Sequence, residues 1–280
     1  MTTVPTRTLP SGDELPRLGF GTWNLDDETI DRAIRTAIDA GYAHVDTAEG
    51  YGNEAAVGAA LAEYDRDDVF LTSKVLPKHL HYGSVIESCE ASLDRLGVDY
   101  LDLYLIHWPN PAVSLRESLD AMATLHDRGL VRNVGVSNFS AYQLGCAQRV
   151  ADVPIAVNQI EFHPWFQRPD LVEYCRETGV AVEAAAPLAR TEIFEDEVVR
   201  ELAETYDRSP ATVVLRWAIQ RGITVLPKSS TPAHIRANAD ISDWELDEAD
   251  VERLDDRDRN APIYDTPTRD WTDDVYGIPE

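Results

Sequence analysis

Residues 100–109 read YLDLYLIHWP, an apolar run that stops abruptly at a histidine. A short continuous apolar run of this kind is typical of a strand buried on both faces of a parallel sheet. Two other runs end similarly: VFLTSK (69–74) stops at a lysine, and AHVDTAEGYGNE (43–54) carries an aspartate and then a tyrosine. Parallel α/β barrels build their active sites at the C-terminal ends of the strands. We therefore predict one catalytic site formed by Asp46, Tyr51, Lys74 and His107.

Strand-like and helix-like runs alternate along the whole chain. The strand candidates are 18–22, 42–47, 69–74, 101–107, 133–137, 155–161, 180–185 and 223–228. Amphipathic helical runs lie between them, and SPATVVLRWAIQRG (209–222) shows the serine cap and first-turn proline of a good helix start. Eight strand–helix repeats without a break in composition predict an α/β protein, one (β/α)8 TIM barrel domain spanning residues 1–280.

Three segments fall outside this repeat. Residues 193–206 and 246–256 predict two extra helices, and residues 5–16 predict a hairpin that plugs the N-terminal end of the barrel. The tail after Asn260 is polar and contains prolines, so we expect it to be irregular.

The charge balance disfavours two classes of binding partner. The chain has 25 basic and 50 acidic residues, a formal net charge of -25, which disfavours nucleic acid and anionic membranes. The acidic residues are spread along the chain, and its only lysines are Lys74, Lys78 and Lys228. We interpret this surface as halophilic, since the Debye length falls to about 3 Å at 1 M salt. An ordinary solvated acidic surface is the alternative.

Localisation follows from three features of the sequence. No apolar run approaches the ~20 residues of a membrane span. The polar start MTTVPTRTLPSGDEL lacks the hydrophobic stretch of a signal peptide. Cys89, Cys146 and Cys175 lack the spacing of a metal site, and we interpret them as reduced, buried thiols. We expect a cytoplasmic protein that is a monomer and holds no metal.

The four strand-end groups suit the reduction of a carbonyl. An ammonium favours the ionised form of a neighbouring phenol, so we expect Lys74 to lower the pKa of Tyr51 from about 10. Asp46 is the natural counter-charge for a buried lysine, and His107 can hydrogen-bond a substrate oxygen. No side chain donates hydride, so a nicotinamide cofactor is implied. No GxGxxG follows the first strand, which argues against a Rossmann site.

The sequence resembles the aldo-keto reductase family, in its compact prokaryotic form. The motifs GYAHVDTAEGYGNE, DYLDLYLIHWP, GLVRNVGVSNF, VNQIEFHP and LPKSSTPAHIRAN match in order and spacing. The resemblance implies a TIM barrel that binds NADP(H) across the strand ends and reduces small aldehydes or ketones. It also implies that Tyr51 is the proton donor, that Lys74 and Asp46 tune it, and that His107 orients the substrate.

The resemblance extends to residues that contact cofactor and substrate. For the cofactor these are Gly21, Thr22, Trp23, Asp46, Ser137, Asn138, Gln159, Ala185, Pro187, Leu188, Lys228, Ser229, His234 and Asn238. Ser137, Asn138 and Gln159 would hold the nicotinamide carboxamide, Lys228 and Ser229 the 2′-phosphate, and Asn238 the adenine. The substrate would meet Trp23, Tyr51, His107 and Trp108.

Two positions depart from the family pattern. Ala185 stands where an aromatic residue usually stacks on the nicotinamide ring, so apolar contact is missing there. His234 stands where an arginine usually grips the 2′-phosphate, and a neutral histidine binds anions less well than a bidentate guanidinium. We therefore expect NADP(H) as cofactor, with NAD(H) use also possible.

Other interpretations remain open at this level. One is a regulatory or sensor module that binds a nicotinamide cofactor without significant turnover. Another is a barrel hydrolase or isomerase that uses Glu161 or Glu183, although no supporting motif accompanies either residue. Trp165 and Phe166 fit a substrate pocket and loop packing equally well.

Overall fold

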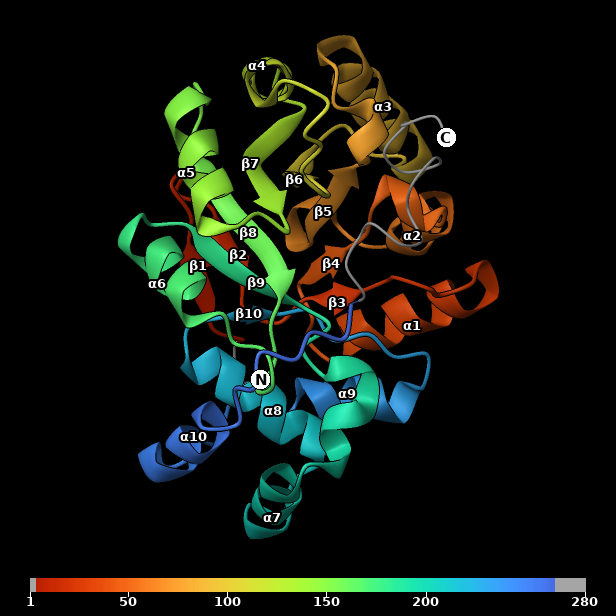
Figure 1. Ribbon diagram of the computed structural model, residues 1–280. Coiled ribbons are helices and arrows are strands. Elements are labelled where there is room, and N and C mark those ends of the chain that lie inside the picture. The colour runs from red at the N-terminus through yellow and green to blue at the C-terminus, as the bar shows by residue number, and fades with distance from the viewer. Residues whose placement is uncertain (1–3, 265–280) are drawn as a thin grey trace, which may run out of the picture.

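The structure is a computed structural model, and residues 4–264 are described. Its centre is a sheet of eight parallel strands, which lie in the sheet in the same order as in the chain (Figure 1). The strands are β3 (Phe20–Gly21), β4 (His44–Asp46), β5 (Phe70–Val75), β6 (Leu101–Ile106), β7 (Val131–Ser137), β8 (Ile155–Glu161), β9 (Ala181–Ala185) and β10 (Thr224–Val225).

The first and last strands meet, so the sheet closes into a barrel. Leu18 forms a parallel bridge with Val225, and the backbone N–H of Gly19 donates to the Val225 carbonyl at 2.9 Å. A Cβ atom on Gly19 would lie 2.5 Å from the Leu226 side chain, which explains the glycine at this close approach. β10 is shorter than the predicted strand 223–228, since Pro227 has no N–H for the ladder.

Helices cover the outside of the barrel and connect successive strands (Figure 1). They are α1 (Asp27–Asp39), α2 (Glu54–Leu61), α3 (Tyr82–Leu96), α4 (Leu115–Asp127), α5 (Ala141–Val150), α6 (Pro169–Glu177), α8 (Pro210–Gln220) and α9 (Pro232–Ala239). The two predicted extra helices are present as α7 (Glu197–Thr205) and α10 (Glu248–Asp255). Short 3₁₀ turns lie at Glu49–Tyr51, Arg66–Asp68, Pro77–His79 and Ala189–Glu195. The sequence patterns did not single out α2, because EAAVGAAL is nearly all apolar and shows no helical periodicity.

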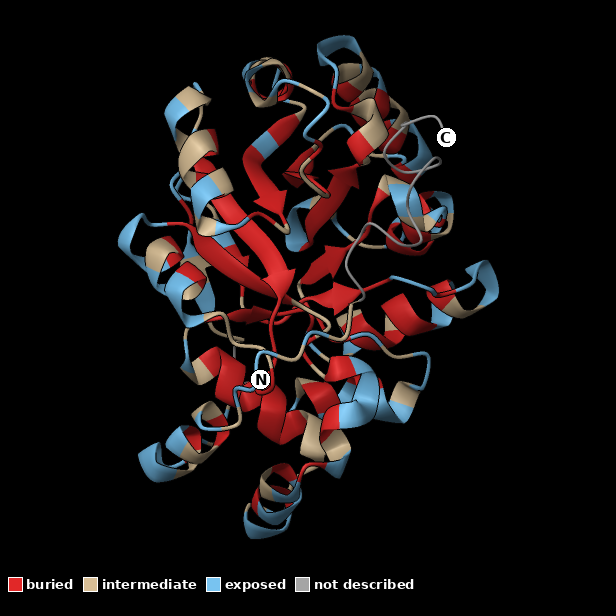
Figure 2. Ribbon diagram, in the orientation of Figure 1, coloured by how far each residue is buried: buried red, intermediate tan, exposed pale blue. Residues whose placement is uncertain are grey.

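The predicted hairpin plugs the N-terminal end of the barrel. β1 (Thr6–Thr8) and β2 (Glu14–Pro16) pair in antiparallel fashion. Leu9, directly after β1, and Leu15, within β2, are buried. These leucines pack inside the barrel with Phe70, Leu103, Leu105, Ala156, Val157 and Ala181. The interior is therefore apolar at the plugged end, and the strands are buried almost throughout (Figure 2).

The structure also bears on the expected irregular tail and on the expected absence of a membrane span. Residues 261–264 form neither helix nor strand, and the rest of the tail expected to be irregular lies outside the described residues. Among residues 4–264 no helix has the length and apolar character needed to cross a membrane.

Candidate active site

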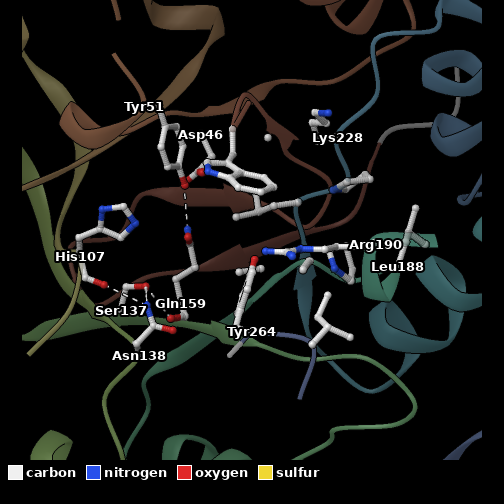
Figure 3. Close-up of a pocket in the computed structure, with 18 of the residues that line it drawn as sticks. Asp46, Tyr51, His107, Ser137, Asn138, Gln159, Leu188, Arg190, Lys228 and Tyr264 are labelled. Atoms are coloured by element: carbon white, nitrogen blue, oxygen red, sulfur yellow. Dashed lines mark hydrogen bonds between the residues drawn. The ribbon is translucent and has the colours of Figure 1, made fainter. Parts of the chain in front are cut away.

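A cavity of about 510 Å³ lies at the C-terminal ends of the barrel strands (Figure 3). Its volume falls in the range of about 300–1,000 Å³ that is usual for small-molecule sites. Most residues predicted for the site line it: Gly21, Trp23, Asp46, Tyr51, His107, Trp108, Ser137, Asn138, Gln159, Ala185, Pro187, Leu188 and Lys228.

The buried Lys74 amine connects the acidic and phenolic groups beneath this cavity. Its Nζ donates to Asp46 Oδ1 at 2.7 Å, to the Thr47 carbonyl at 2.9 Å and to Tyr51 Oη at 3.1 Å. Lys74 is fully buried, and Asp46 is nearly so. Asp46 ends β4, Lys74 is the last residue but one of the neighbouring strand β5, and Tyr51 is carried by the 3₁₀ turn after β4. Hydrogen bonds thus bring together three of the four residues predicted for the catalytic site, Asp46, Tyr51 and Lys74.

The expectation that the pKa of Tyr51 is lowered is corrected by the surroundings of this phenol. Burial raises the pKa of the Tyr51 phenol above its ordinary value, and the nearby Lys74 ammonium opposes this shift without reversing it. The pKa of Lys74 is itself raised: burial acts to lower it, but the Asp46 carboxylate and Tyr51 outweigh that effect. Lys74 therefore stays charged and Tyr51 stays protonated at neutral pH, the state that a proton donor requires.

His107 faces Tyr51 across the site. The two rings are 5.7 Å apart between centroids and lie edge to face. Burial, with a contribution from the charge on Lys74, holds the pKa of His107 well below its usual range. The imidazole is therefore neutral and can take part in a hydrogen bond with a polar substrate atom without carrying a charge.

Three amide and hydroxyl side chains form the other wall of the site. Ser137 Oγ donates to the Gln159 carbonyl at 2.9 Å, and Asn138 Nδ2 donates to the His107 carbonyl at 3.0 Å. Gln159 Nε2 donates to Asp46 Oδ2 at 2.9 Å. These contacts fix the orientation of each polar group, as drawn in Figure 3. A carboxamide needs both donors and acceptors, and this set of side chains offers both.

Four predicted cofactor residues do not line the cavity. Thr22 is buried, and its hydroxyl donates to the Asp46 carbonyl at 3.0 Å, so it supports the wall from behind. Ser229 follows Lys228 and accepts a bond from the Thr231 N–H at 3.1 Å. On α9 His234 is exposed and Asn238 is buried.

The alternative site residues have structural partners. Trp165 Nε1 donates to Asp196 Oδ2 at 2.8 Å, and Phe166 packs 6.3 Å from the His163 ring, so both belong to loop packing. Glu161 and Glu183 are buried, and neither lines the cavity. A hydrolase that uses these two carboxyl groups therefore gains no support.

Arg190 and Tyr264 line the cavity but were not predicted from the sequence. The Arg190 guanidinium lies 5.3 Å from the ring centroid of Trp23 and 5.3 Å from that of Tyr264 (Figure 3). The Tyr264 backbone N–H donates to the carboxylate of Glu161 at 3.2 Å, and Glu161 pairs with Ala185 in the sheet. The tail therefore brings an aromatic ring to the same cavity that Ala185 lines. The other lining residues that were missed are Ala186, Thr191, Leu226, Pro227 and Ile263.

A parallel α/β barrel with a lysine–aspartate pair beside a tyrosine at its mouth is an arrangement suited to proton transfer to a bound substrate. Within residues 4–264 no group of His, Cys, Asp and Glu side chains could hold a metal ion. Residues 17–259 match the aldo/keto reductase family. The chain belongs to this family.

Relatives and solved structures agree with this assignment. The oxidoreductase YtbE of Bacillus subtilis is 38% identical, over 93% of this chain and 95% of the relative. Glyoxal reductase of the same organism is 37% identical, over 88% of this chain and 90% of its own. An aldo-keto reductase of Bombyx mori in complex with NADP shares 30% identity with a TM-score of 0.90, and 99% of each chain is covered.

The predicted fold and reaction class are therefore confirmed. The protein is an NAD(P)H-dependent oxidoreductase that reduces carbonyl groups, on a TIM barrel without a Rossmann motif. The regulatory alternative gains no support from any of these comparisons.

Proposed function

We propose that the enzyme reduces small aldehydes and ketones to alcohols with NADPH, and that Tyr51 is the proton donor. The observation that carries this proposal is the position of Lys74, whose amine bonds both Asp46 and Tyr51 at the mouth of the barrel. A binding protein has no need of a buried ammonium bonded to a phenol, whereas a proton donor does.

The polar groups around the cavity fit an extended nicotinamide dinucleotide. Ser137, Asn138 and Gln159 would hold the carboxamide at one end, and Lys228 would meet the 2′-phosphate at the other (Figure 3). When bound, the cofactor supplies the hydride. The Arg190 guanidinium lies between these two ends, where it adds positive charge to the cavity of an otherwise acidic protein.

The proton moves through the chain's own groups. Neutral His107 would hydrogen-bond the substrate oxygen, which gains negative charge as the carbonyl is reduced, and Tyr51 would give that oxygen its proton. The Lys74 ammonium, 3.1 Å from Tyr51 Oη, then stabilises the phenolate left behind. Asp46 keeps the ammonium charged inside the barrel.

A direct assay tests this function. Trp23 and Trp108 give the cavity an aromatic wall, and Bacillus glyoxal reductase is a relative, so glyoxal and nitrobenzaldehyde are suitable first substrates. NADPH absorbance should fall with time only when an aldehyde is present. No oxidation of NADPH with either aldehyde, in low or high salt, would rule the proposal out.

The choice of cofactor depends on His234. We propose that His234 faces the 2′-phosphate, and His234→Arg should raise the preference for NADPH over NADH by roughly ten- to a hundredfold. A charge-assisted hydrogen bond contributes roughly 1.5–3 kcal/mol, and 1.4 kcal/mol is tenfold. The measurement is kcat/KM for both cofactors. Tyr142→Arg, at an exposed position on α5, adds the same charge elsewhere and should leave the ratio unchanged. An equal ratio in wild type and His234→Arg would place the 2′-phosphate away from α9.

The surface charge predicts a response to salt. We propose a halophilic enzyme, because a net charge of -25 makes the folded chain repel itself and its anionic cofactor at low ionic strength. Raising KCl from about 0.1 M to about 2 M, where the Debye length falls below 3 Å, should raise the melting temperature without weakening NADPH binding. Thermal melts and fluorescence titrations measure both. Stability that declines steadily as salt is added would refute the halophilic interpretation.

We also propose a single-domain monomer in the cytoplasm. Cys89 and Cys175 are buried free thiols, which suits a reducing compartment. Cys146, also expected to be buried, is only partly so, since it lies on the outer helix α5. Size-exclusion chromatography with light scattering should give the mass of one chain, and cell fractionation should recover the protein in the cytosol. A dimer mass would rule out the monomer, and recovery in another cell fraction would rule out the cytoplasmic location.

A further inference from the structure

Glu183 lies inside the barrel, directly below the predicted active site. It belongs to β9, its side chain is completely buried, and it does not line the cavity. It reaches the site through Gln159, whose Nε2 donates to Glu183 Oε2 at 3.0 Å and to Asp46 Oδ2 at 2.9 Å. One amide nitrogen is therefore held between two carboxyl groups.

The surroundings of Glu183 disfavour a charge on it. Burial, together with the charge on Asp46, raises the pKa of Glu183 to about 8, and the Gln159 bond and Lys74 oppose this only in part. His44 faces it from β4, with Nδ1 at 3.9 Å from Glu183 Oε1, too far for a hydrogen bond. Burial lowers the pKa of His44 to about 4, so both groups are neutral at pH 7.

A carboxyl group in this position needs an explanation other than stability. Among the described residues, Glu183 Oε1 has no hydrogen-bond partner. A buried polar atom without a partner destabilises the folded state, and an apolar side chain would avoid that cost. The contact that Glu183 does make is with Gln159, a predicted cofactor residue.

We propose that Glu183 is a positioning residue that holds the Gln159 amide with its nitrogen toward the barrel interior and its oxygen toward the cavity. Gln159 Nε2 donates to both Asp46 Oδ2 and Glu183 Oε2, and reversing the amide would set its oxygen against the Asp46 carboxylate, which has no proton to donate. The oriented oxygen is then ready to accept a hydrogen bond from the cofactor carboxamide. This inference rests on the proposed role of Gln159 in cofactor binding.

Two substitutions separate positioning from filling space. Glu183→Met keeps the volume but removes the acceptor, and the Kd for NADPH, measured by quenching of protein fluorescence, should rise roughly three- to tenfold, as expected for one hydrogen bond. Glu183→Gln restores an acceptor oxygen and should bring the Kd back to within about twofold of the wild type. Unchanged binding in Glu183→Met, or equal losses in both variants, would overturn the proposal.

A pH series supplies a readout that a purely structural residue would not change. Glu183 is neutral below about pH 8 and charged above it. A charge there favours the positive ring of NADP⁺ over the neutral ring of NADPH. From pH 7 to pH 9 the affinity for NADP⁺ relative to NADPH should rise at least about threefold in the wild type and stay flat in Glu183→Gln. A flat ratio in the wild type would contradict the proposal.

Glu183→Gln also tests whether the charged form of Glu183 destabilises the folded protein at high pH. Because the pKa of Glu183 in the folded state lies above its unfolded value, its contribution to stability is complete below about pH 4.5 and is lost as pH rises through 8. Glu183→Gln should therefore be at least as stable as the wild type at pH 9. These binding experiments do not require turnover. The proposed role of Glu183 and the proposed reductase function can therefore be rejected independently of each other.

Discussion

Replacing Tyr51 with phenylalanine should lower turnover of an aldehyde by at least about 10²- to 10⁴-fold, the usual contribution of general acid–base catalysis. The variant loses only the hydroxyl that bonds Lys74 Nζ, so the fold and NADPH binding should stay close to those of the wild type. The measurements are kcat with a saturating aldehyde, and the Kd for NADPH from fluorescence quenching.

Tyr104→Phe is the matched control for this variant. Tyr104 on β6 is fully buried, and its hydroxyl has no hydrogen-bond partner among the described residues, so removing it should leave turnover unchanged. A Tyr51→Phe enzyme that retained more than about a tenth of wild-type turnover would show that another group donates the proton.

Lys74→Met should abolish turnover and also destabilise the protein. The substitution leaves the Asp46 carboxylate buried without its cation, and breaking a buried ion pair in this way costs about 3–5 kcal/mol. The phenolate form of Tyr51 also loses the charge that stabilises it. Chemical denaturation and kcat measure the two effects separately.

The double variant Asp46→Asn, Lys74→Met separates the stability effect from the chemistry. It removes both charges, so much of the lost stability should return, while turnover should stay as low as in Lys74→Met. If Lys74→Met were as stable as the wild type, Asp46 would have to be protonated or paired with another group inside the barrel. Recovery of turnover in the double variant would remove Lys74 from the mechanism.

The sequence predicted the features that depend on local pattern. Buried strand runs end at Asp46, Lys74 and His107, and a strand end is visible in the sequence because an apolar run stops there. The two extra helices and the hairpin plug carry their own local signals and are present in the structure. Helix α2 carries no polar face and gave no such signal.

The missed features depend on contacts between distant segments. Tyr264 reaches the cavity because its backbone bonds Glu161, which lies 103 residues earlier in the chain. The direction of the Tyr51 pKa shift depends on how deeply the phenol is enclosed, and the sequence shows only that a lysine is near. The hydrogen bond from Gln159 to Glu183 forms because these residues are paired across β8 and β9 and both side chains point into the barrel. This pairing depends on the register of the two strands, which the sequence does not show.

The complete burial of Lys74 also determines how the protein can be labelled. The sequence contains only three lysines, so an amine-reactive dye meets two accessible side chains, partly exposed Lys78 and exposed Lys228. Lys228 lines the cavity and Lys78 does not. Lys228 can therefore report on whether the cavity is occupied, and Lys78 can serve as the internal reference for the same reagent. Mass spectrometry can compare the labelling of Lys228 with that of Lys78 without any engineered tag.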